Sequence, residues 1–199
     1  MGNKLVIDND SLGNIFKYYY FDRDNGGYIT KKIIAFFIDK IIKGEIVVLD
    51  KVFAEFQNWG VKTPAKEEFE KQIKGYVEKT TTPDFLNDVN ILINNHYISK
   101  AANGLTKDEI DIALQPYRDK YADLYLIAYC QYLTIIKETP TLITEESIKP
   151  DKKLIQKIPT ICHSNSIVCK DLPYLIFEIY RDELKFKLSV KDAGAAVSA

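Results

Sequence analysis

Short apolar runs alternate with longer amphipathic stretches along the chain. An uninterrupted apolar run bounded by polar turns is typical of a buried strand, whereas apolar residues that recur every three to four positions indicate a helix with one buried face. The apolar runs predict strands at residues 4–7, 46–49, 141–144 and 167–169. The periodic stretches predict helices at residues 11–20, with Ser11 as the N-cap, at residues 30–43, from Asp50, from Asp119 and at residues 171–181.

This alternation of strands and helices favours a parallel sheet with right-handed crossovers. Residues 60–118 interrupt the alternation with a stretch rich in Lys and Glu, in which Pro64 and Pro83 mark the starts of amphipathic helices. We therefore predict an α/β fold, a three-layer α/β/α sandwich with a central parallel sheet and a helical insertion at about residues 60–118. The length of 199 residues fits one domain. We expect that domain to span residues 1–192 and to be followed by a disordered tail at residues 193–199.

Charge and cysteine content limit which partners and which cellular compartment we expect for the chain. The net charge of −1 provides no overall positive field, so any nucleic acid must be bound by a local basic patch. The three cysteines leave one unpaired under any disulfide scheme and lack the spacing of a zinc knuckle, so we expect plain thiols in a reducing compartment. No stretch reaches the roughly 20 apolar residues that cross a membrane, and the first apolar run is too short for a signal peptide. We expect a cytoplasmic bacterial protein with no membrane partner.

Acidic residues follow two of the predicted strands directly. Asp8 and Asp10 come after the first strand, and Glu145 and Glu146 come after the strand at residues 141–144. Ligands of open parallel sheets bind at the carboxyl ends of the strands, so these side chains should meet in space. Clustered carboxylates provide the oxygen ligands that magnesium and manganese prefer.

Two further acidic residues lie inside segments that are otherwise apolar. Glu55 belongs to VFAEF and Asp123 to ADLYLIAYC. Burial of an unpaired carboxylate costs several kcal/mol, so each residue needs a cation, hydrogen bonds or a route to solvent. A metal ion shared with the strand-end acids would meet this need. The structural alternative is that single acids merely cap helices, as Asp10 could, or lie solvated beside a functional neighbour, as Glu145 could.

Taken together, these segments resemble the PIN-domain family. LVIDNDSL resembles the opening PIN motif, an apolar strand followed by Asp-Thr-Asn. VFAEF resembles the second acidic segment, ADLYLIAYC the third, and LITEES the closing Thr-x-Asp. The ending KIPTICHSNSIVC, which runs into a predicted helix, is most similar to a branch of PIN-like proteins without an assigned function.

The resemblance implies a metal-dependent endoribonuclease that uses magnesium or manganese to cut single-stranded RNA. The catalytic metal ligands that it implies are Asp8, Glu55, Asp123 and Glu146, with Asp10 as a further ligand and with Thr144 and Glu145 in support. Many small bacterial PIN domains are toxins of toxin–antitoxin pairs, so the implied partners are an antitoxin protein and a second copy of the chain. The chain departs from the family pattern at Asn9, where Thr is usual, at Asp10, where Asn is usual, and at Glu146, where Asp is usual.

Lysines follow the fourth acidic residue in the segment at residues 148–159. Lys149, Lys152 and Lys153 are close enough in sequence to reach a phosphate held by the acidic cluster, so we predict weak substrate contacts for them. Lys31 and Lys32 are weaker candidates. A solvated lysine-rich surface is the structural alternative for all of these residues.

Two other functions fit parts of the sequence. IDNDSL also resembles the Asp-x-Asp motif of haloacid-dehalogenase-type phosphatases, with Asp8 as the nucleophile and Asp10 as the general acid. The departures at Asn9, Asp10 and Glu146 also allow a catalytically degenerate PIN-like domain that only binds RNA or a protein. Manganese binding would distinguish the nuclease from the degenerate domain, and an aspartyl-phosphate on Asp8 would identify the phosphatase.

Overall fold

The computed structural model describes residues 3–18, 28–60, 62–148 and 153–184. Its centre is a sheet of parallel strands in the order β2-β1-β3-β4. The strands are β1 (Asn3–Ile7), β2 (Ile46–Val47), β3 (Thr139–Ile143) and β4 (Val168–Lys170). β1 pairs with β3 along its whole length, from Asn3↔Thr139 to Ile7↔Ile143. The predicted parallel sheet is confirmed.

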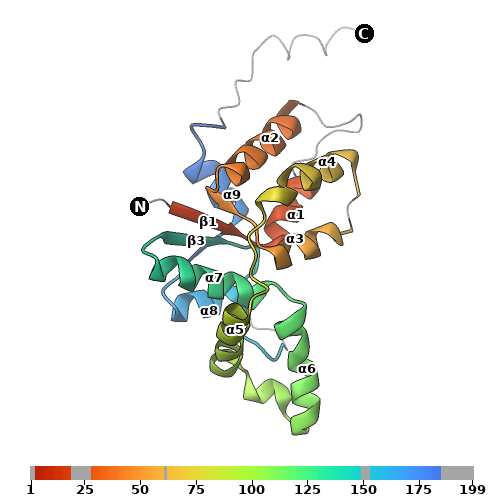
Figure 1. Ribbon diagram of the computed structural model, residues 1–199, viewed down its shortest axis with the longest axis vertical. Helices are drawn as coiled ribbons and strands as arrows, with labels where there is room; N and C mark the ends of the chain where they lie inside the picture. The colour runs from red at the N-terminus through yellow and green to blue at the C-terminus, as the bar shows by residue number, and fades with distance from the viewer. Residues whose placement is uncertain (1–2, 19–27, 61, 149–152, 185–199) are drawn as a thin grey trace.

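Helices cover both faces of this sheet (Figure 1). α1 (Asn9–Tyr18) and α2 (Tyr28–Ile42) connect β1 to β2 and lie on one face, whereas α7 (Asp123–Ile135) and α8 (Ile158–Ser164) lie on the other. Because β2 and β3 lie on opposite sides of β1, right-handed crossovers place the two connections on opposite faces. This arrangement confirms the predicted three-layer α/β/α sandwich.

Several helices separate β2 from α7, as the sequence predicted for residues 60–118. They are α3 (Asp50–Gln57), α4 (Pro64–Ile73), α5 (Pro83–His96) and α6 (Lys107–Asp119), with one-turn 3-10 helices at Lys74–Tyr76 and Ser99–Ala102. α4 packs against α2, whereas α5 packs against α7 and α6 packs against α5. Figure 1 shows α5 and α6 projecting from the end of the molecule opposite α2.

Helix α7 lies at the centre of the packing. Most of its side chains, from Leu124 to Leu133, are buried. It contacts β3 and β1 on one side and α5 and α8 on others, so each of its faces requires apolar residues. The described helices include none with the length and apolar character needed to cross a membrane.

Some helix boundaries differ from the predictions. α1 begins at Asn9 rather than at Ser11, because the side chain of Asp8 and not that of Ser11 caps it. α7 begins at Asp123 rather than at Asp119, because α6 continues to Asp119. α8 was not predicted, and the last helix is a short α9 (Leu172–Tyr174) that continues as a π-helical turn at Leu175–Ile179. The predicted tail at residues 193–199 lies outside the described residues.

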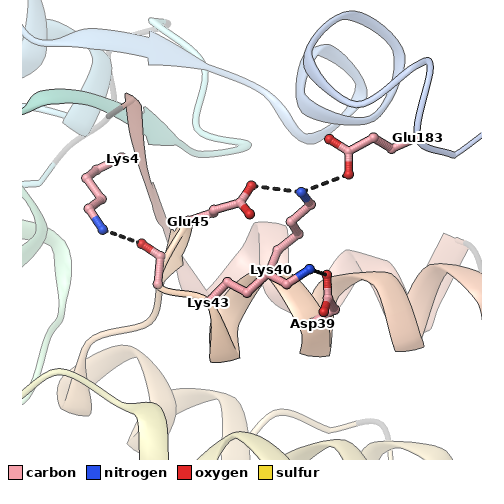
Figure 2. A network of polar contacts seen from close by, with 7 residues as sticks. Lys4, Asp39, Lys40, Lys43, Glu45 and Glu183 are labelled. Carbon is pink, nitrogen blue, oxygen red and sulfur yellow. Dashed lines mark hydrogen bonds and ion pairs between the residues drawn. The ribbon is translucent and has the colours of Figure 1, made fainter. Parts of the chain in front are cut away.

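A buried lysine joins the C-terminal segment to α2 (Figure 2). The Nζ atom of Lys40 lies 2.8 Å from Glu45 and 2.8 Å from Glu183, and it lies 4.9 Å from the centre of the Tyr180 ring. Burial alone would lower the pKa of Lys40, but its hydrogen bonds to the two carboxylates outweigh burial and raise it. Lys40 therefore stays charged and links three segments of the chain.

Candidate functional site

A cavity of about 620 Å³ opens where β1 and β3 end. The chain leaves β1 toward β2 and leaves β3 toward β4, on opposite sides of the sheet, so the cavity lies at the topological switch point where open parallel sheets bind ligands. The acidic residues that line it come from four separate segments. They are Asp8, Asp10, Glu55, Asp123 and Glu146.

Asp8 forms the floor of the cavity and is also the N-cap of α1. Its Oδ1 atom accepts a hydrogen bond from the backbone N–H of Ser11 at 2.6 Å, and the side chain of Thr144 is hydrogen-bonded to the same carboxylate. Only 6% of Asp8 is exposed. Burial raises the pKa of Asp8 from 3.8 to about 7, although the bonds to Thr144 and Ser11 oppose this shift. Asp8 can therefore hold a proton near neutral pH.

Glu55 and Asp123 meet at the N-terminus of α7. Glu55 projects from α3, and its Oε1 atom accepts a hydrogen bond from the backbone N–H of Ala122 at 2.9 Å. Burial raises the pKa of Glu55. Burial, together with the neighbouring charges of Glu146 and Glu55, raises the pKa of Asp123 from 3.8 to about 7. The positive end of the α7 dipole partly compensates the negative charge gathered there.

Glu146 extends from the end of β3 across the cavity. Its Oε2 atom accepts a hydrogen bond from the backbone N–H of Ile158 at 2.9 Å, at the start of α8. Its Oε1 atom lies 3.5 Å from the ammonium of Lys153. Its own N–H donates to the hydroxyl of Thr144 at 3.1 Å, which is the hydroxyl that also bonds to Asp8. Thr144 thus connects Asp8 and Glu146, the first and the fourth predicted acid.

Glu145 and Asp10 differ in their placement. Glu145 accepts hydrogen bonds from the backbone N–H of Leu172 at 2.9 Å and from the Ser11 hydroxyl at 3.4 Å, so it secures α9 from behind the cavity wall. Asp10 lies in the first turn of α1 and lines the cavity itself. The charge of Asp10 raises the pKa of both Asp8 and Glu55. Asp10 therefore adds negative charge to the site, whereas Glu145 supports its scaffold.

The carboxylates share the cavity but do not form a closed ligand shell. Among the described residues, no group of three or more acidic, histidine or cysteine side chains is arranged to hold a metal ion. Asp8, Glu55 and Glu146 each direct an oxygen to a backbone N–H at the start of a helix. The oxygens of these three residues are therefore partly engaged, and a metal ion would need the remaining ones together with Asp123.

One buried oxygen at the cavity wall lacks a partner. The side-chain oxygen of Asn9, which lines the cavity beside Asp8, is shielded from water and has no hydrogen-bond partner in the described part of the chain. An unsatisfied buried acceptor costs roughly 1–3 kcal/mol. Asn9 therefore carries a buried polar atom beside Asp8 whose burial is not compensated by a hydrogen bond from any described residue.

Basic and aromatic side chains form the rim of the cavity. Lys153, one of the lysines for which we predict substrate contacts, lines it, whereas Lys149 and Lys152 lie outside the described residues. Lys31 and Lys32 belong to α2, which contributes no residue to the described cavity wall. Further lining residues that were not predicted lie at the junction of α6 and α7: Tyr117, Lys120 and Tyr121. The signal available in the sequence was their position immediately before Asp123.

The cysteines gather next to the sheet as free thiols. Cys130 and Cys162 are buried, and Cys169 on β4 is half-buried. A hydrogen bond between Cys162 and Cys169 raises the pKa of Cys162 and lowers that of Cys169.

Comparison with protein families matches residues 17–179 to a family described as "Domain of unknown function (DUF4411)". The chain belongs to this family. The match confirms the expected membership of a family without an assigned function, and the description names neither an activity nor the PIN class. No curated protein and no solved structure matches the chain.

Proposed function

We propose that the protein is a metal-dependent endoribonuclease of the PIN-domain class that cuts single-stranded RNA. The observation that carries this proposal is the placement of Asp8, Glu55, Asp123 and Glu146 in one cavity at the switch point of the sheet. These are the residues of the four segments that resemble PIN motifs. Asp8 follows β1, Glu55 lies in α3, Asp123 begins α7 and Glu146 follows β3, in the order of the motifs. Four acids selected from sequence alone would rarely meet in this way by chance.

The donor set suits a hard divalent cation. Asp123 and Asp8 would hold magnesium or manganese, supported by the carboxylates of Glu55 and Glu146. When bound, such an ion supplies charge neutralisation, polarisation of a phosphodiester and a water of lowered pKa. Because the pKa values of Asp8 and Asp123 are raised to about 7, cation binding should displace protons from these carboxyl groups near neutral pH.

The remaining residues orient the substrate. Lys153 and Lys120 place ammonium groups at the rim, where they can pair with phosphates that flank the bond to be cut. Thr144 keeps Asp8 and Glu146 in a fixed relation. Asp10 strengthens the local negative field, which favours cation entry.

Calorimetric titration with manganese tests the site. Wild-type protein should bind the ion, and Asp123→Asn should weaken binding by more than tenfold, because an amide is a poorer ligand for a hard cation. Asp39→Asn is the matched control, since Asp39 lies on the exposed face of α2 in an ion pair with Lys43 and should bind manganese like wild type. Failure of wild-type protein to bind manganese would favour the degenerate, binding-only PIN-like domain.

The phosphatase alternative makes a different prediction. It requires a covalent aspartyl-phosphate on Asp8 during hydrolysis of a phosphomonoester. Trapping and mass spectrometry of that adduct would establish it, whereas the nuclease should form no adduct.

The biological role that we propose is that of the toxin in a bacterial toxin–antitoxin pair. The support for this role is the resemblance to small bacterial PIN domains. Expression in a bacterial host should arrest growth, and Asp123→Asn should relieve the arrest at equal protein level. Equal toxicity of the two proteins would contradict a toxic nuclease activity.

A further inference from the structure

The junction between α6 and α7 presents an exposed aromatic ring next to a lysine at the cavity rim. Tyr121 is 38% exposed. Both Tyr121 and Lys120 line the cavity. The Nζ atom of Lys120 lies 6.0 Å from the centre of the Tyr121 ring. Lys120 lines the same cavity as Glu55 and Asp123.

The ring is held in a fixed position. Tyr117, which is buried, packs against Tyr121 in an edge arrangement with ring centres 5.3 Å apart. The backbone N–H groups of Lys120 and Tyr121 both donate to the carbonyl of Pro116, each at 2.8 Å. Aromatic residues fixed in this way lose little freedom when a ligand binds.

Hydrogen bonds from α7 and α3 also hold the C-terminal end of α6 in place. The hydroxyl of Tyr125 on α7 donates to the carbonyl of Arg118 at 2.6 Å. The ammonium of Lys51 on α3 donates to the carbonyl of Asp119. The last carbonyls of α6 are therefore satisfied by α3 and α7, the two helices that carry Glu55 and Asp123. Any ligand on Tyr121 is thereby placed at a defined position relative to these acids.

We infer that Tyr121 and Lys120 form a nucleotide subsite that selects single-stranded RNA, in which one base stacks on the Tyr121 ring and its phosphate pairs with Lys120. An exposed ring next to a cation is the arrangement by which proteins bind single strands without a need for a particular base. A base inside a duplex cannot use it, because its faces are covered by its neighbours. The inference rests on the proposed function, since it takes the substrate of the cavity to be RNA.

Binding measurements test the subsite separately from cleavage. The probes are a labelled single-stranded oligouridylate and the duplex that it forms with oligoadenylate. Fluorescence anisotropy measures the binding of each probe, once in chelator and once with calcium. Tyr121→Leu should weaken binding of the single strand by about 5- to 150-fold, the loss expected for one base–aromatic stack, whereas Tyr121→Phe should keep wild-type affinity. Neither change should alter binding of the duplex.

Lys120→Gln provides a second test on an exposed side chain whose replacement should leave the fold intact. It should lower the slope of log affinity against log salt by about 0.7, the value for one phosphate contact on a single strand. Equal affinity of Tyr121→Leu and wild type, equal loss in Tyr121→Leu and Tyr121→Phe, or an unchanged salt slope in Lys120→Gln would overturn the subsite. Absence of single-strand binding by wild type in both buffers would overturn it too. Binding with the expected variant pattern but without cleavage would support the subsite and reject the nuclease.

Discussion

The Glu55 carboxylate accepts a 2.9 Å hydrogen bond from the backbone N–H of Ala122, the residue directly before Asp123. This bond joins α3 to the start of α7 and sets two of the predicted acids side by side. Asp8 and Glu146 make similar bonds to the starts of α1 and α8. These acids therefore stabilise the fold and line the cavity at once. Backbone hydrogen bonds oppose the burial-driven rise in the pKa of Asp8 and Glu55, whereas for Asp123 the neighbouring carboxylates add to the effect of burial.

Asp8 both caps α1 and lines the cavity, and substitutions can separate these two roles. An Asn side chain keeps the oxygen that caps α1 but removes a buried charge, so Asp8→Asn should melt at or above the wild-type temperature in chelator at pH 8. Asp8→Ala loses the cap and should be less stable than Asp8→Asn by about 1 kcal/mol. Thermal unfolding of the three proteins measures both effects. If Asp8→Asn melts as low as Asp8→Ala, the ionised carboxylate itself stabilises the fold.

Stability of the metal-free protein should fall as pH rises from about 4 to about 7. The pKa values of Asp8 and Asp123 are raised from 3.8 to about 7, so in this range the folded protein binds protons that the unfolded chain has released. More protons in the folded state mean that the free energy of unfolding decreases with pH, here by on the order of a few kcal/mol. Asp50 has a lowered pKa, so it opposes this trend only below about pH 3.8.

Urea unfolding in chelator across this pH range measures the effect. Asp123→Asn should show a shallower decrease than wild type, because one of the two groups no longer titrates. A wild-type stability that is flat or rises between pH 4 and pH 7 would show that Asp8 and Asp123 are ionised throughout.

The central sheet and the acidic cluster could be predicted from the sequence because both depend on local signals. Buried parallel strands appear as apolar runs, and Asp8 and Glu146 follow such runs directly. Glu55 and Asp123 were found because a charge inside an apolar segment requires compensation.

Other features depend on contacts between distant residues and could not be predicted in the same way. The bonds of Glu55 to Ala122 and of Glu146 to Ile158 join residues that are 67 and 12 positions apart. The periodicity of apolar residues does not indicate contacts between such positions. The short bridges Leu49↔Glu78 and Tyr97↔Ile155 also involve single residue pairs outside regular strands. The rim residue Tyr121 was missed because an isolated aromatic residue between helices resembles ordinary core in sequence.

Gly13 should not tolerate the addition of a methyl group. It lies within α1, where alanine is normally about 1 kcal/mol better than glycine, but a Cβ atom would lie 2.6 Å from the Trp59 ring. We expect Gly13→Ala to lose about 1–3 kcal/mol through overpacking. Trp59 is the one tryptophan of the chain, so its fluorescence can follow both the unfolding and the displacement of the ring.

Gly60→Ala is the matched control, because no atom lies within 4 Å of its added Cβ. It should leave stability and tryptophan emission near their wild-type values. A stabilised Gly13→Ala protein would show that Trp59 does not pack on α1 as described.

Asp50 should be required as a charged acceptor at the start of α3. Its carboxylate accepts hydrogen bonds from the backbone and hydroxyl groups of Thr80 and Thr81 and from the N–H of Lys51. Asp50→Asn replaces one acceptor by an amide donor that faces other donors, so it should cost about 1–3 kcal/mol in chemical unfolding. Asp39→Asn, which breaks only an exposed ion pair, should cost less than about 1 kcal/mol. Similar losses in the two variants would mean that the Asp50 bonds contribute no more than a surface pair.

Cleavage of a labelled single-stranded RNA by purified wild-type protein and by Asp123→Asn tests the proposed nuclease most directly. Wild type should cut the RNA with manganese or magnesium and should stop in chelator, and Asp123→Asn should lose at least about a hundredfold in rate while remaining folded. Cleavage by Asp123→Asn at the wild-type rate, or intact RNA with wild type and either metal, would contradict a nuclease centred on this cavity.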